Sequence, residues 1–195
     1  GQDYTVDKSG NVVVYKIVEG LALQRDDIYL AALKYLENAY KDTKYKIVIN
    51  SKENGVVAGE GEYLQFHEDN FFPYSYFLNA PFTLRVDTKD GRAKLSIILS
   101  YYTGKRSNIN ESIDIHDQVS AFQPVNEDES EHRKLYTKAF QKLYEKISKT
   151  LNEVETVLKS TRSSLPETDW WYLAWIINRQ LHIPKHYLMQ GLYYW

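Results

Sequence analysis

The stretch that decides the fold is FTLRVDTKDGRAKLSIILSYY, residues 82–102. It predicts a β-hairpin, because two runs rich in β-branched and aromatic residues flank Asp90-Gly91, a dipeptide that favours a tight turn. A turn at this point sets Asp87 opposite Lys94 on one face, which is a favourable charge pair. The other face is apolar throughout, with the cross-strand pairs Val86–Leu95, Leu84–Ile97 and Phe82–Leu99. Turn chemistry and side-chain pattern therefore agree on one register.

The residues before this hairpin predict one strand and one helix. NVVVYKIV, residues 11–18, is rich in β-branched residues and follows a Ser-Gly turn signal, so we expect a strand. RDDIYLAALKYLENAY, residues 25–40, has apolar residues at helical spacing. Its first turn holds Asp26 and Asp27, where the helix dipole favours negative charge. A helix therefore follows the first strand.

A second hairpin is predicted between KYKIVINS, residues 44–51, and GVVAGEGEYLQF, residues 55–66. An Asn-Gly dipeptide at their junction accepts the positive φ of a tight turn. A two-residue turn would set the two isoleucines opposite Glu62 and Glu60. We expect instead a three-residue turn, because it gains a charge pair. Its facing pairs are Lys46–Glu62, Ile47–Gly61 and Ile49–Gly59.

The following residues predict an irregular stretch and then a long helix. Residues 104–126 are polar and show no clear period, so we expect no regular structure there. From residue 127 to Ser160, apolar residues recur in steps of three and four, which predicts an amphipathic helix whose stripe must be covered. The order is then strand, helix, four strands, helix. This order places the chain in the α+β class.

Three stretches resemble one family: EGLALQRDDIYLAALKYL (residues 19–36), SKENGVVAGEGEY (residues 51–63) and the hairpin of residues 82–102. The family consists of secreted proteins of unknown function from Bacteroidetes with a TATA-binding-protein-like (TBP-like) fold. The resemblance implies a β-α-β-β-β-β-α topology, a curved antiparallel sheet with helices on one face, and export across the inner membrane. It implies no activity, because the family has no assigned catalytic residues. The chain departs from the family at Gln24, where a serine or threonine usually caps the helix.

A C-terminal helical extension, residues 165–195, is expected after an α+β domain of residues 1–164. In DWWYLAWIINRQLH the apolar run is far shorter than the roughly 20 residues that span a membrane, so no transmembrane segment is predicted. Ser164 and Glu167 have capping-box spacing, and we expect a helix from there until Pro184. It is apolar over most of its circumference, so it should contact the domain and something more. The second contact is either the FFPYSYF loop of its own chain, residues 71–77, in a monomer, or a second copy of the protein in a homodimer.

Composition narrows the classes of partner and the compartment. The 24 Lys and Arg residues balance 26 Asp and Glu residues, and no segment concentrates the basic residues that nucleic-acid binding requires. The absence of cysteine excludes disulfides, thiolate nucleophiles and Cys-based zinc sites. The chain starts at Gly1 rather than Met. Together with the resemblance, this leads us to expect a secreted, periplasmic or envelope-associated protein whose signal segment has been removed.

Several short patterns suggest chemistry, and each has a plainer explanation. Glu60 and Glu62 share a strand face, as paired carboxylates would, but such strand charges are usually solvated. His116 stands between acidic residues, but no nucleophile accompanies it. His182 and His186 have the spacing of metal ligands on a helix, but the proline between them disfavours that helix. We therefore predict no catalytic residue, no cofactor and no metal site.

Aromatic residues concentrate in FHEDNFFPYSYF, residues 66–77, and in the tail, residues 170–195. The two segments either form an added core layer or present rings to a glycan or a protein. We predict a non-catalytic binding or assembly module outside the cytoplasm, and the alternative is a hydrolase or other enzyme of envelope glycans. The predicted surface comprises Phe71, Phe72, Tyr74, Tyr76, Trp170, Trp171, Trp175, Tyr193, Tyr194 and Trp195.

Overall fold

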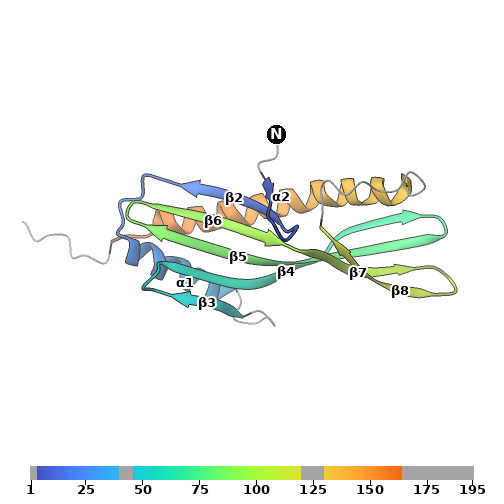
Figure 1. Ribbon diagram of the computed structural model, residues 1–195, viewed down its shortest axis with the longest axis horizontal. Helices are drawn as coiled ribbons and strands as arrows, with labels where there is room; N and C mark the ends of the chain where they lie inside the picture. The colour runs from blue at the N-terminus through green and yellow to red at the C-terminus, as the bar shows by residue number, and fades with distance from the viewer. Residues whose placement is uncertain (1–3, 40–45, 120–129, 164–195) are drawn as a thin grey trace, which may run out of the picture. The chain divides into compact units, whose positions relative to one another are not determined.

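The structure is a computed structural model that describes residues 4–39, 46–119 and 130–163. Within these ranges the chain forms one antiparallel sheet of eight strands and two helices (Figure 1). The strands are β1 (Tyr4–Val6), β2 (Val12–Val18), β3 (Ile47–Ser51), β4 (Val56–Phe71), β5 (Tyr74–Lys89), β6 (Arg92–Leu99), β7 (Tyr101–Ser107) and β8 (Ser112–Gln118). The helices are α1 (Arg25–Ala39) and α2 (Ser130–Ser160). The predicted α+β class is confirmed, with β1, β7 and β8 added to the expected order.

The hairpin of β5 and β6 has the predicted register. All three predicted apolar pairs are present, and Asp87 pairs with Lys94. Gly91 in the turn has a φ of 72°, a conformation that glycine adopts without steric penalty. Around this hairpin the strand order is β1-β2-β6-β5-β4-β3. The stretch that decided the prediction is thus the centre of the sheet.

Both helices pack on one face of the sheet (Figure 1). Helix α1 lies against β4 and β5, while α2 lies against β2, β4, β6 and α1. The predicted apolar stripe of α2 faces the sheet, where its residues are buried together with those of α1 and the central strands. The fully buried large side chains include Ile28, Leu36, Leu84, Leu95, Ile97, Leu143, Ile147 and Leu158. This single core holds the two helices to the sheet.

The hairpin of β3 and β4 has neither of the two registers considered, so the predicted pairing of Lys46 with Glu62 is wrong. A wider loop, residues 52–55, joins the strands, and a bulge interrupts β3. Gly55 takes a positive φ of 65°, whereas the side chain of Asn54 donates a hydrogen bond to Ser51 and closes the wider loop. The observed pairs are Ser51–Val56, Asn50–Val57, Ile49–Ala58 and Ile47–Gly59.

Strands β7 and β8 replace the irregular stretch that was expected after residue 104. They pair with each other from Tyr101–Gln118 to Ser107–Ser112, and β7 also pairs with the first half of β5. Strand β8 is an edge strand exposed along most of its length. Because only Ile113 and Ile115 alternate with polar residues in it, its period-two signal is too short to predict a strand. The expected FFPYSYF loop is likewise the end of a hairpin, in which β4 passes into β5.

A register shift in β4 divides the sheet into two parts. It lies between Tyr63 and His67, where Gln65 has a positive φ of 42° and its N–H donates to Asn79 Oδ1 at 2.7 Å. On one side of this shift β5 pairs with β6, and on the other side it pairs with β7. The second part has the order β4-β5-β7-β8, and we call its two hairpins, residues 66–79 and 101–118, the paired hairpins.

Candidate functional site

The paired hairpins place the first predicted aromatic segment at one end of the sheet. Ser75 pairs with Ser107, so the turns of the two hairpins lie next to each other at the same end of the sheet (Figure 1). The β4–β5 turn consists of Phe72 and Pro73, joined by a cis peptide bond. The β7–β8 turn consists of residues 108–111. Two narrow turns therefore project side by side.

The four predicted aromatic residues of this segment have different environments. Tyr76 is 6% exposed and belongs to the core, with its ring edge-on to Phe71 at a centroid distance of 6.1 Å. Phe71 and Tyr74 are half-buried beside it. Phe72 is 98% exposed. The structure thus presents Phe71, Phe72 and Tyr74 at the hairpin end, while the predicted residues of the tail, from Trp170 onward, lie outside the described residues.

Tyr74 links the two turns. The guanidinium of Arg106 lies 4.7 Å from the centroid of its ring, and its hydroxyl donates a hydrogen bond to Glu111 Oε1 at 3.2 Å. In the second turn, Asn108 Oδ1 accepts hydrogen bonds from the backbone N–H groups of Asn110 and Glu111, both at 2.8 Å. Such side-chain-to-backbone bonds preorganise a turn. The two turns are therefore held together, and each is held in shape.

Helix α2 supports the paired hairpins through polar contacts. Lys138 Nζ lies 3.2 Å from Asp69 Oδ2 and 5.7 Å from the centroid of the Phe71 ring. Partial burial opposes ionisation of Asp69, but hydrogen bonds from Lys138 and from the N–H of Asn70 hold the pKa of its carboxyl below the usual value. Further along, the Tyr136 hydroxyl donates a hydrogen bond to Asp117 of β8. These contacts fix the hairpins on the helix.

A buried histidine lies under α2 in the same region. His67 is 3% exposed, and neither ring nitrogen has a hydrogen-bond partner. Burial lowers the pKa of its imidazole, the positive charges of Lys142 and Lys138 lower it further, and Asp69, 3.7 Å away, opposes them. A general base must reach its substrate, and a side chain this deeply buried does not. His67 therefore belongs to the packing of the hairpins.

The acidic pair Glu60 and Glu62 lies on the sheet face that α1 and α2 leave open, in a hollow of about 390 Å³. Glu62 accepts a hydrogen bond from Thr103 at 3.3 Å. His116 stacks on Tyr101, which lines the same hollow, with ring centroids 4.3 Å apart, and its strand partner is Thr103. The described ranges contain no group of three or more side chains that would hold a metal ion. His182 and His186 lie outside those ranges.

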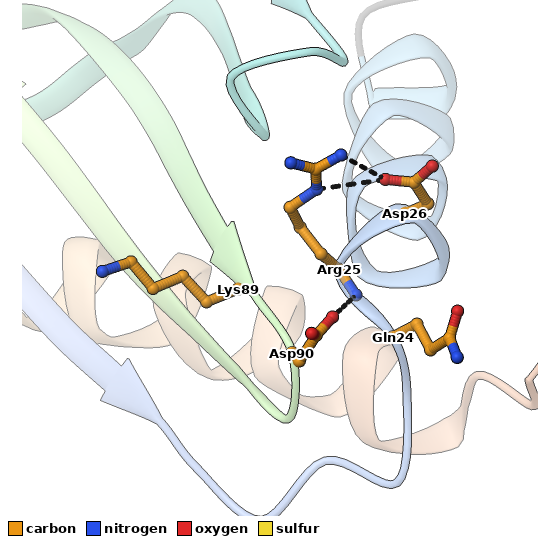
Figure 2. A pocket seen from close by; sticks show the side chains of 5 residues that line it. All are labelled: Gln24, Arg25, Asp26, Lys89 and Asp90. Carbon is orange, nitrogen blue, oxygen red and sulfur yellow. Dashed lines mark hydrogen bonds and ion pairs between the residues drawn. The ribbon is translucent and has the colours of Figure 1, made fainter.

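A pocket of about 530 Å³ lies where α1 begins (Figure 2). The N–H of Arg25 donates to Asp90 Oδ1 at 2.8 Å, so the β5–β6 turn supplies the cap that Gln24 does not. The Arg25 guanidinium is engaged by Asp26 and by the carbonyl of Glu53. Lys89 extends away from these groups in Figure 2. Because Arg25, Asp26 and Asp90 are engaged in these structural contacts, this pocket has a structural explanation.

Sequence reasoning missed Ile109, Arg106 and Glu111, because all three lie in the stretch expected to be irregular. Ile109 is 98% exposed in the β7–β8 turn, and the other two contact Tyr74. One signal was present: a single isoleucine stands between Asn108 and Asn110, residues typical of turns. This isoleucine adds nothing to the core, which makes it a candidate contact residue.

Residues 15–102 match the domain of unknown function (DUF4468) with TBP-like fold. The predicted resemblance to a family of unknown function with a TBP-like fold is confirmed, whereas secretion stays a prediction. The match to the TBP-like domain runs from within β2 to the beginning of β7, so it includes the β4–β5 hairpin and leaves out most of the β7–β8 hairpin and α2. No curated protein matches the chain.

Two solved structures share the TBP-like fold. A TBP-like protein from Parabacteroides distasonis superimposes with a TM-score of 0.57 at 12% identity, over 81% of this chain and 98% of its own. A DUF4468 family protein from Bacteroides ovatus gives a TM-score of 0.54 at 15% identity, over 84% of this chain and 94% of its own. At these identities the likeness shows the fold, and a fold does not imply a function.

Proposed function

We propose that this chain is a non-catalytic binding or assembly module that works outside the cytoplasm. The observation that carries the proposal is Phe72, which is 98% exposed in a two-residue turn at the end of the long β4–β5 hairpin. A large ring in water costs hydration free energy and adds nothing to the core. Aromatic residues are enriched at contact surfaces. Phe72 therefore has a binding explanation and no folding explanation.

The side chains around this end support binding rather than catalysis. Phe71 and Tyr74 flank Phe72 with rings already positioned by Lys138 and Arg106. Among the described residues, the carboxylates Glu60 and Glu62 lie on the open face of the sheet, while His67 is buried under α2. General acid–base or nucleophilic catalysis needs such groups within hydrogen-bonding reach of one another. The exposed rings therefore support a binding role more directly than these groups support catalysis.

Nucleic acid is not part of the proposal. A protein that binds a groove of DNA needs an excess of positive charge on the contact face. On the face opposite the helices, Arg85 is paired with Asp87 at 2.6 Å, and the acidic residues Glu60 and Glu62 lie nearby. The aromatic residues of the tail, Trp170, Trp171, Trp175, Tyr193, Tyr194 and Trp195, are proposed to extend the binding surface in a monomer or to join two copies.

The proposed compartment rests on the family resemblance. No helix in the described part of the chain is long and apolar enough to cross a membrane. Fractionation of cells that express the full-length gene tests the location. We expect the protein in the periplasm, the medium or the envelope fraction, with an N-terminal segment removed. A cytoplasmic protein with its N-terminus intact would contradict export.

The binding role is tested by retention on cell envelopes and on immobilised polysaccharides. We expect the intact chain to be retained without turnover of any glycan, and Phe72→Ser to be retained less. Leu64→Ser is the matched control, because Leu64 is 65% exposed but lies in the register shift of β4, away from the turns. Turnover of a glycan would support the enzyme alternative. Equal retention of the Phe72 and Leu64 variants would rule out this surface.

A further inference from the structure

We propose that the turns of the paired hairpins enter the surface of a lipid bilayer, with Phe72 and Ile109 as the inserted side chains. This inference rests on the proposed binding role and names its partner. Both side chains are 98% exposed, more than any other large apolar residue in the described part of the chain. Their turns project at the same end of the sheet, because Ser75 pairs with Ser107. The protein thus holds two exposed apolar groups on neighbouring turns.

Both apolar groups are carried on well-defined turns. The β4–β5 turn has only two residues between paired strands. The β7–β8 turn is closed by the hydrogen bond from Asn108 N to Glu111 O at 2.9 Å, in addition to the two bonds that Asn108 Oδ1 accepts. A side chain that is already positioned loses little conformational entropy when it binds. Most of the free energy gained by burying the two side chains therefore remains as binding affinity.

Polarity increases in layers behind the two turns. The first layer pairs Phe71 with Tyr74, whose hydroxyl bonds to Glu111. The layer behind it is polar and consists of the strand pairs Asn70–Ser75 and Ser107–Ser112. Aromatic residues with a polar tip favour the interface between acyl chains and water. In the β4–β5 hairpin this order from apolar to amphipathic to polar matches the order met on leaving a bilayer, whereas in the β7–β8 turn Ile109 stands among Asn108, Asn110 and Glu111.

The geometry fits a bilayer better than a protein surface. At about 3.3 Å per residue, the β4–β5 turn reaches about 3 Å and the β7–β8 turn about 7 Å beyond its last strand pair, before the side chains are added, comparable with the roughly 5–10 Å to which interfacial helices are buried. Two narrow turns do not provide the roughly 800 Å² that each partner buries in a standard protein interface. A fluid bilayer needs no complementary pocket. The paired hairpins have no excess of positive charge for anionic lipid, because Lys105 and Arg106 stand against five acidic residues: Glu68, Asp69, Glu111, Asp114 and Asp117. Neutral lipid should therefore suffice.

The test is flotation of the intact chain with vesicles of phosphatidylcholine and phosphatidylethanolamine. We expect the protein to float, also at high salt, because the inserted groups are uncharged. Phe72→Ser and Ile109→Ser should each weaken partitioning about tenfold, and the double variant should stay at the bottom of the gradient. Leu64→Ser should float like the unaltered chain. Unchanged urea midpoints show that the variants fold.

A second readout locates the insertion. Because the chain has no cysteine, Ile109→Cys carries an environment-sensitive fluorophore at a single place. Vesicles should shift its emission to the blue and leave a fluorophore on Leu64→Cys unchanged. The inference is overturned if the intact chain does not float, or if the double variant floats equally well. Retention on envelopes that depends on Phe72 without any vesicle binding would identify a protein or glycan partner; the binding role would then stand without this inference.

Discussion

At the scale of single residues, burial decides what each side chain near the hairpin end can do. Phe72 and Ile109 are fully exposed, whereas His67 lies a few residues away under α2 with no partner for either ring nitrogen. A buried polar group without a hydrogen bond lowers stability. An imidazole in this position is tolerated as the neutral form, because the charged form would lose its hydration next to Lys138 and Lys142. His67 therefore makes stability depend on pH.

His67 should make the protein less stable as the solution becomes acidic. Its pKa in the folded chain is lowered, while an unfolded histidine has a pKa of about 6.5. The unfolded state then binds more protons, so this contribution is complete above that unfolded value and is lost as the pH falls below it. We expect His67→Leu to flatten the fall in unfolding free energy between about pH 7 and about pH 5. Urea denaturation across this range measures both slopes, and equal slopes would contradict the assignment.

At the scale of elements, the turns and close backbone contacts determine how the strands and helices are arranged more than the strands' own conformational preferences do. The β5–β6 turn closes its hairpin and also caps α1 through Asp90. The contact of β5 with β7 depends on Gly104, where a Cβ atom would lie 1.8 Å from the carbonyl oxygen of Phe77. Each of these residues connects parts of the fold that are distant in the sequence. Each can therefore be tested by one substitution.

Asparagine at position 90 should still cap α1, whereas alanine should not. Asp90→Ala removes the acceptor for the N–H of Arg25 and should lower the unfolding free energy by about 1 kcal/mol. Asp90→Asn keeps an oxygen acceptor at this place. It should lower the unfolding free energy by only about a few tenths of a kcal/mol, because a negative charge near the helix N-terminus is lost. Urea denaturation of the three proteins decides the matter. If the two variants are equally stable, the side chain does not act as the cap.

Gly104→Ala should separate β7 from β5. At a φ of 149° and with the Phe77 carbonyl in the way, the added methyl group forces the two strands apart. We expect a loss of about 3 kcal/mol or more. Gly20→Ala is the matched control, because Gly20 also has a positive φ, of 71°, but nothing lies within 4 Å of its added Cβ. Its cost should be about 1 kcal/mol, from backbone strain alone. Similar losses for both would show that β7 is not held at this distance.

The sequence predicted those elements whose signals are local. The β5–β6 register followed from one turn and alternating side chains, and α2 followed from a long apolar stripe buried on the sheet. The β7–β8 hairpin was missed because an exposed edge hairpin needs no apolar alternation, and its pairing with β5 is a long-range contact. Because the β7–β8 hairpin was not predicted, Ile109 was not proposed as a surface residue, whereas Phe72 was. The cap from Asp90 was equally hidden, since it comes from another part of the chain.

At the scale of the whole molecule, one long helix connects the two parts of the sheet. The C-terminal half of α2 covers the central strands, where Ile147, Val154 and Leu158 are buried. The N-terminal half supports the paired hairpins through Tyr136 and Lys138. The hairpins are thus fixed to the same element as the core. A force on their turns would be carried to the domain through α2.

The last prediction concerns the extension, residues 165–195. The described core is built from α1, α2 and the sheet, so we expect a chain truncated after Ser164 to fold. If the tail packs on the aromatic residues of its own chain, as we expect, the intact protein is a monomer. Truncation should then lower stability and expose Phe71, while Phe72, already exposed, changes little. The alternative is that the tail joins two copies. The intact protein is then a dimer at micromolar concentration, and Trp171→Asp with Trp175→Asp gives a folded monomer.

Light scattering and urea denaturation of the intact and truncated chains separate the two arrangements. A monomer that loses stability on truncation supports the intrachain contact, because the rings of Trp170, Trp171 and Trp175 would be leaving apolar surroundings. A change of mass per particle from two chains to one supports the dimer. A truncated chain as stable and as soluble as the intact one, with only the deleted mass missing, would show that the tail is a free appendage. Both arrangements would then be wrong, and the binding surface would be limited to the paired hairpins.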